Sequence, residues 1–344
     1  MTDSGTVNPT EFVALDAGFG NTRLYGSQGS VMLQSLVATN GTQAVSQWAA
    51  GGLQRTSKAK VKPLLVRSDM GDFYVGPGAH EVGRPVENLD LDRMTGPETK
   101  ALLYGALTQY QPPASINLIV ALPIAMGQGE GGDHIKDQTK AMFEGEHTWW
   151  VADPKGKADV KHSLTIENVL VTSQPAGAMF DFLLNADGSM SPAKKALRAQ
   201  GAFGIISLGF NTIELMAVED GRMIEKHVAG ESKGVHYLLQ LLNPQEAYSL
   251  GELDSKLRAG KLDYAPVLPR WEREVFGQIE KHWDKAMQRR FSAVFVVGGG
   301  ALLIQDALRA KFKDRLEIPD DPLLSIARGC FKFAQAQAKT KAKR

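Results

Sequence analysis

The chain has 344 residues, and its 39 Lys and Arg residues nearly balance 38 Asp and Glu, which gives a net charge of +1 at pH 7. This balance excludes a general electrostatic attraction to nucleic acid or to a membrane surface. A hydrophobic content of 43% and a charged content of 22% exclude wholesale disorder. The single cysteine, Cys330, excludes an intramolecular disulfide and a cysteine-rich metal site.

Neither a membrane span nor a secretory leader is expected. No run approaches the roughly 18 to 20 apolar residues that cross a bilayer. The first twelve residues have neither a basic nor an apolar signal region. We therefore expect a cytoplasmic protein, long enough for two domains.

The first half of the chain alternates strand and helix patterns. Residues 185–201 predict a linker that closes this half. The patterns predict strands at 12–15, 22–25 and 31–37, an irregular insertion at 39–97 with a short strand at 72–75, a helix at 97–110, a buried strand at 116–123, a helix at 134–144, strands at 147–152 and 164–172, and a helix at 175–184.

The second half repeats this plan. It begins with another hairpin, and the elements that follow are a helix at 234–242, a charged helical insertion, a glycine-rich strand–turn–helix unit at 294–310 and a last helix from 322. The repetition predicts an α/β fold of two domains that face each other across a cleft. The first would comprise residues 10–185, with an inserted subdomain at about 38–100, plus the helix 322–339; the second would comprise residues 202–321, with an insertion at about 243–290, and residues 340–344 would be a basic tail.

Each half opens with a strand, a tight turn of small residues and a second strand. Turns without side-chain bulk let backbone N–H groups converge on an anion, although one such turn is also typical of a hairpin that binds nothing. Two such turns facing each other predict a site that binds one polyphosphate between them. The candidate residues are Gly18, Gly20, Asn21 and Thr22 in the first turn and Gly209, Asn211 and Thr212 in the second, with Phe19 and Phe210 in the same turns.

Five motifs in order resemble the actin, DnaK-type chaperone and sugar kinase superfamily, above all the ParM-type plasmid-segregation actins. The motifs are LDAGFGNTR, VTSQPAGA, SLGFNTIEL, VVGGGALLIQDAL and LLSIARGCFKFAQ. The resemblance spans nearly the whole chain and implies a two-domain actin-like fold (a duplicated ribonuclease H-like fold) with a nucleotide in the interdomain cleft. It also implies Mg²⁺ and ATP/ADP as cofactors, ATP hydrolysis, and head-to-tail filaments in plasmid segregation or as a prokaryotic cytoskeleton.

The resemblance assigns two catalytic roles. Asp16 would hold the water shell of Mg²⁺, and Gln174 would orient the water that attacks the terminal phosphate. The alternatives are that Asp16 caps its own turn and that Gln174 is a polar residue ending a strand. Arg23 stands where the family usually has a lysine that contacts the phosphates.

Other family positions concern the nucleoside. Gly299, Gly300 and Leu303 would approach the base, and Gly234 would lie near the ribose and phosphates, although a helix N-cap explains Gly234 equally well. GTP remains open beside ATP as the nucleotide. We expect the chain to associate with copies of itself in a head-to-tail filament and to have a DNA-binding adaptor as a further partner. We expect neither direct nucleic-acid binding nor membrane binding.

One departure from the family pattern concerns hydrolysis. The second phosphate motif normally begins with aspartate, and here that position is Ser207, which contributes no negative charge. Glu214 stands where aspartate is common, and we expect its charge to lie further outward. A nucleotide-binding scaffold without turnover therefore stays open, as does a small-molecule kinase, although residues 204–212 contain no carboxylate to act as its base.

Overall fold

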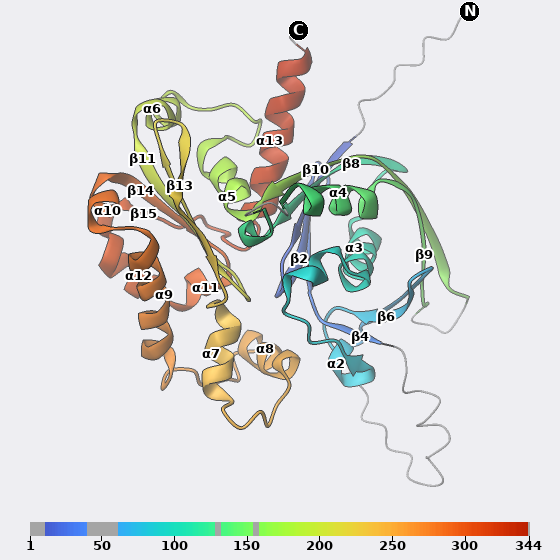
Figure 1. Ribbon diagram of the computed structural model, residues 1–344. Helices are drawn as coiled ribbons and strands as arrows, with labels where there is room; N and C mark the ends of the chain where they lie inside the picture. The colour runs from blue at the N-terminus through green and yellow to red at the C-terminus, as the bar shows by residue number, and fades with distance from the viewer. Residues whose placement is uncertain (1–10, 40–60, 128–131, 154–157, 343–344) are drawn as a thin grey trace, which may run out of the picture.

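The computed structural model describes residues 11–39, 61–127, 132–153 and 158–342, and it consists of two sheets with helices around and between them (Figure 1). The polar leader, residues 40–60 of the expected insertion and the last two residues of the basic tail lie outside the described residues. Among the described helices, none combines the length and apolar character needed to cross a membrane.

The first half of the chain builds the larger sheet. Its strand order is β3-β2-β1-β8-β10-β9-β5-β6-β4-β7. The elements are β1 (Glu11–Ala17), β2 (Asn21–Gly26), β3 (Gly29–Gln34), β4 (Val37–Thr39), β5 (Leu64–Ser68), β6 (Gly71–Val75), α2 (Ala79–Val82), β7 (Arg84–Pro85), η1 (Leu91–Thr95), α3 (Pro97–Tyr110), β8 (Ser115–Leu122), η2 (Ile124–Gly127), α4 (Gly132–Phe143), β9 (Gly145–Val151), β10 (Val160–Ser173) and α5 (Gln174–Leu183).

The second half builds the smaller sheet, in the order β13-β12-β11-β14-β15. Its elements are α6 (Pro192–Gln200), β11 (Ala202–Leu208), β12 (Ile213–Glu219), β13 (Arg222–Glu231), α7 (Val235–Leu242), α8 (Leu250–Arg258), α9 (Leu268–His282), α10 (Lys285–Arg290), β14 (Phe291–Val297), α11 (Gly299–Leu303), α12 (Gln305–Phe312), η3 (Lys313–Arg315), β15 (Leu316–Glu317) and α13 (Ser325–Ala342).

The two sheets repeat one pairing pattern. In the first, β1 pairs antiparallel with β2 and parallel with β8. In the second, β11 pairs antiparallel with β12 and parallel with β14. Each half thus places a tight turn at the carboxyl end of a central strand, which is the edge where α/β proteins bind ligands.

The sheets share a core around α5 and α13, which lie between them in Figure 1. Apolar residues of both sheets pack there, among them Ile119 from β8 and Phe203 from β11, together with Cys330 from α13. Cys330 is fully buried there, as a small residue of this core. The two helices cross closely, because a Cβ built on Gly329 of α13 would overlap the carbonyl oxygen of Gly177 on α5.

Several local expectations were wrong. The expected linker contains α6, because Ser191 caps a helix by accepting a hydrogen bond from Lys194 N–H and Pro192 occupies its first position. Strand β5 lies inside the insertion expected to be irregular. The glycine-rich unit forms two short helices separated at Ile304 rather than one helix. The last helix begins at Ser325 rather than at 322.

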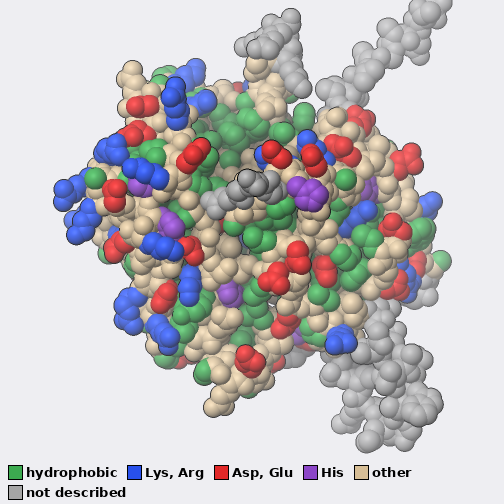
Figure 2. Space-filling model, viewed as in Figure 1, with side chains coloured by type: hydrophobic (Ala, Val, Ile, Leu, Met, Phe, Trp, Pro, Cys, Tyr) green, Lys and Arg blue, Asp and Glu red, His purple; other side chains and the backbone are tan. Residues whose placement is uncertain are grey.

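The surface charges are unevenly distributed despite the small net charge. On the face shown in Figure 2, Lys and Arg gather over the elements of the smaller sheet, whereas Asp and Glu are prominent over the larger one. The long-range attraction of this protein for a charged partner therefore depends on which half is approached.

Candidate functional site

A cavity of about 480 Å³ lies between the two sheets, and both tight turns line it. Its volume is within the range of about 300–1,000 Å³ that is common for small-molecule sites. Fourteen of the residues proposed from the sequence line this cavity: Asp16, Gly18, Phe19, Gly20, Asn21, Arg23, Gln174, Ser207, Gly209, Phe210, Asn211, Thr212, Gly299 and Leu303.

Three other proposed residues lie behind this lining. The Thr22 hydroxyl makes a hydrogen bond with the Ser35 hydroxyl. Gly234 packs against the second turn, where an added Cβ would come within 2.5 Å of Phe210 O. Gly300 packs against Leu208 in the same way. These residues support the shape of the cavity wall rather than face the cavity.

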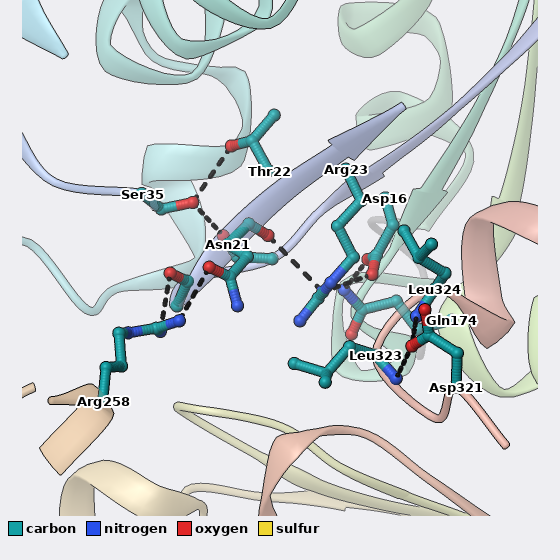
Figure 3. Close-up of polar contacts among 12 residues, drawn as sticks. Asp16, Asn21, Thr22, Arg23, Ser35, Gln174, Arg258, Asp321, Leu323 and Leu324 are labelled. Atoms are coloured by element: carbon teal, nitrogen blue, oxygen red, sulfur yellow. Dashed lines mark hydrogen bonds and ion pairs between the residues drawn. The ribbon is translucent and has the colours of Figure 1, made fainter. Parts of the chain in front are cut away.

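The carboxylate of Asp16 is the most buried charge on the cavity wall. It is fully buried at the end of β1, and it accepts hydrogen bonds from Arg23 Nη1 at 2.7 Å and from Gln174 Nε2 at 2.8 Å (Figure 3). Burial raises the pKa of Asp16 above its ordinary value, while Arg23 and Gln174 act in the opposite direction. The three side chains come from β1, β2 and the first residue of α5.

Hydrogen bonds from behind hold both turns in place. In the first, Ser35 donates its N–H to Gly20 O and its hydroxyl to Gly18 O. In the second, the N–H groups of Gly234, Val235 and His236 bind three turn carbonyls at the start of α7. Gly18 is required sterically, because a Cβ there would come within 2.7 Å of Asn21 O. The turns therefore present a fixed main chain to the cavity.

The expectation that Glu214 carries its charge outward was wrong. Glu214 is fully buried on β12, directly opposite Ser207, and both faces of this strand are covered. Its Oε1 accepts a hydrogen bond of 2.7 Å from the backbone N–H of Ile124, which belongs to the first half of the chain. Its Oε2 has no hydrogen-bond partner in the structure, and burial raises the pKa of Glu214 to about 8.

Sequence reasoning missed the contribution of the helical insertion to the cavity. Arg258 and Asp254 of α8 line it, as do Leu257 and Tyr264. No short motif marks these residues, because they reach the cavity only through the packing of α8 against the first turn. Within the described residues, no group of three or more His, Cys, Asp or Glu side chains forms a metal site of protein ligands alone.

Comparison with known proteins agrees with this geometry. Residues 14–177 match the family model for the N-terminal domain of actin-like proteins. The chain has the actin-like fold. The predicted two-domain α/β actin-like fold and the resemblance to actin-like proteins are therefore confirmed.

Solved structures with the same fold match this chain over nearly its whole length. The actin-like protein Alp7A has a TM-score of 0.72 at 14% identity, covering 96% of this chain and 98% of that one. A ParM filament from Clostridium botulinum gives 0.68 at 15% identity, covering 95% and 99%. An archaeal actin homolog in complex with ADP gives 0.66 at 16% identity, covering 96% and 100%. A comparison with curated proteins finds no significant match.

Glu214 makes the stability of this protein depend on pH. Its pKa is about 4.5 in an unfolded chain and about 8 in the folded protein. Between these values the folded protein holds a proton that the unfolded chain releases, so the stabilisation is complete below pH 4.5 and is lost as the pH rises through 8. Glu214→Gln cannot ionise. The free energy of unfolding, measured by urea titration, should therefore fall more steeply from pH 5 to 8 in the wild type than in the variant, by up to about 1.4 kcal/mol per pH unit.

The pH-dependent difference between the two proteins isolates Glu214 from other titrating groups, because the variant retains them all. The glutamine also keeps an oxygen that can accept the Ile124 hydrogen bond. Parallel pH profiles for the wild type and the variant would contradict the assignment.

Proposed function

We propose that this actin-like protein binds Mg-ATP, or GTP, in the cavity between its two sheets and hydrolyses it slowly to control head-to-tail filament assembly. The main observation that supports this proposal is that both tight turns line one cavity beside the buried Asp16 and Gln174. An archaeal actin homolog of the same fold is solved with ADP, and a ParM protein of the same fold is solved as a filament. Plasmid segregation or another cytoskeletal task in the cytoplasm is the role we propose, with a DNA-binding adaptor as an additional partner.

The residues present fit a magnesium ion held mainly through water. Mg²⁺ in nucleotide sites commonly takes one or two carboxylates, several waters and the phosphates themselves. Asp16 supplies the carboxylate, and the Ser207 hydroxyl lies on the same cavity wall. The ion would neutralise charge on the phosphates.

The remaining residues would position the phosphates and orient the attacking water. The Gln174 amide N–H is held by Asp16, so its carbonyl oxygen is the atom that can accept a hydrogen bond from an attacking water. Arg23 pairs with Asp16, and its guanidinium can also bind phosphate oxygens through two N–H groups. The backbone of the two turns would hold the phosphates without further side-chain charge.

Head-to-tail assembly follows from a cleft that changes with its ligand. A contact between two different faces of the same chain produces a filament when the rotation between successive subunits does not close a ring. A nucleotide bound by both halves would favour one relative position of the halves and therefore one shape of these faces. Loss of the terminal phosphate would remove part of that bias.

A nucleotide-binding scaffold without turnover is the second candidate, and Ser207 is the observation that favours it. This residue occupies the cavity wall where the family pattern has a carboxylate. A small-molecule kinase is less well supported, because Glu214, directly opposite Ser207, does not line the cavity to serve as a base.

Asp16→Asn tests the metal assignment. The amide is nearly isosteric but uncharged, so we expect ATP affinity to lose its dependence on Mg²⁺ and ATP-dependent light scattering to disappear. Asp133→Asn is the matched control, because Asp133 is an exposed carboxylate that pairs with Lys136 away from the cavity. Unfolding midpoints confirm that both variants fold. Mg-ATP-dependent assembly of Asp16→Asn at the wild-type level would overturn the assignment.

Ser207→Asp tests whether the protein hydrolyses the nucleotide slowly or has lost turnover. A carboxylate at this position adds negative charge to help hold the cation, so phosphate release in single-turnover experiments should rise, by about tenfold if it restores one charge-assisted interaction. Ser207→Ala is the control, with neither hydroxyl nor charge, and should not exceed the wild type. A fall in Ser207→Asp below the wild-type rate would show that the site depends on the hydroxyl.

A further inference from the structure

Arg258, the last residue of α8, connects the helical insertion to the first tight turn. Its Nη1 donates to Asn21 Oδ1 at 2.9 Å, and its Nη2 donates to Gly20 O at 3.1 Å. Figure 3 shows Arg258 pointing toward Asn21, apart from the group formed by Asp16, Arg23 and Gln174. These bonds join the two halves of the chain at the cavity wall.

A buried carboxylate fixes the guanidinium in this place. Asp254 is nearly fully buried and accepts hydrogen bonds from Arg258 Nε at 2.8 Å and from Gln34 Nε2 at 2.6 Å. Gln34 ends β3 of the larger sheet, so Asp254 also joins the two halves. The cavity therefore has two arginine–carboxylate pairs on its wall, Arg23 with Asp16 and Arg258 with Asp254.

Arg258 retains capacity for a ligand. A guanidinium has five N–H groups, and the three bonds described above use one each. The side chain is one-third exposed, and it lines the cavity that both turns share. A guanidinium binds phosphate oxygens through strong, charge-assisted hydrogen bonds, commonly through two N–H groups at once.

We propose that Arg258 is a phosphate-responsive latch, which binds the phosphates of a nucleotide in the cavity while it holds the Gly20–Asn21 turn. Occupancy of the cavity would then set how firmly α8 is held to the larger sheet. This inference rests on the proposed function, because it needs a nucleotide in that cavity. It adds to that function a residue from the insertion that couples phosphate binding to the contact between the two halves.

The neighbouring cation on α8, Lys256, provides a control for charge alone. Lys256 lies two residues before Arg258, but it pairs with Glu252 and lies over the ring of Tyr248. It does not line the cavity. Lys256→Ala is therefore a matched control that removes one positive charge from the same helix.

The test measures the affinities of the full-length wild-type protein, Arg258→Ala, Arg258→Lys and Lys256→Ala for Mg-ATP, Mg-ADP and adenosine by calorimetry. We expect Arg258→Ala to weaken ATP and ADP binding about 10- to 100-fold and to leave adenosine binding unchanged. Arg258→Lys should give an intermediate loss, because an ammonium cannot bond Gly20, Asn21 and Asp254 with the same fork. Lys256→Ala should bind all three ligands as the wild type does.

A second measurement follows the contact between the halves. Small-angle scattering should show that ADP makes the wild-type protein more compact, and that this change is smaller in Arg258→Ala. Unfolding midpoints establish that the variant is folded. Both readouts therefore report on the latch rather than on misfolding.

Two results would overturn the inference alone: wild-type ATP affinity in Arg258→Ala, or an equal loss of affinity for adenosine and ATP. A wild-type protein that binds neither ATP nor ADP would contradict the proposed function itself, and the inference with it. The wild-type titration thus distinguishes the two failures.

Discussion

The buried carboxylate of Asp16 is the interaction on which the candidate site depends. A fully buried charge is costly unless donors satisfy it. Arg23 supplies one donor because it lies directly opposite Asp16 across the β1–β2 hairpin, and Gln174 supplies the other because β10 ends two strands away from β1. The register of the hairpin therefore sets Arg23 beside Asp16, and the order of the sheet brings the distant Gln174 to the same point.

The second sheet repeats the geometry with different chemistry. Ser207 and Glu214 face each other across the β11–β12 hairpin as Asp16 and Arg23 do across the first. The first pair is a carboxylate with a cation, and Arg23 donates directly to Asp16 across the hairpin. The second is a hydroxyl with a carboxyl group, and Glu214 finds its donor in the main chain of the other half, at Ile124. Glu214 thus differs from Arg23, its counterpart in the first hairpin, and this difference joins the two halves of the chain.

The sequence allowed the fold class and the two turns to be predicted, because β-branched strands and small turn residues have strong local patterns. It did not predict α6, since a segment rich in Ser, Gly and Pro is typical of a linker until its cap is recognised. Nor did it predict Arg258, which binds a residue 237 positions away and depends on tertiary packing. The expected outward position of Glu214 failed because β12 is covered on both faces, which one strand's sequence does not show.

The central claim is that one polyphosphate is held by both tight turns at once. Hydrogen–deuterium exchange of the wild-type protein with and without Mg-ADP tests it most directly, by following peptides that contain residues 18–22 and 209–212. The account predicts that both turns gain protection together at the same nucleotide concentration. Protection of only one turn, or of neither at saturating nucleotide, would contradict it.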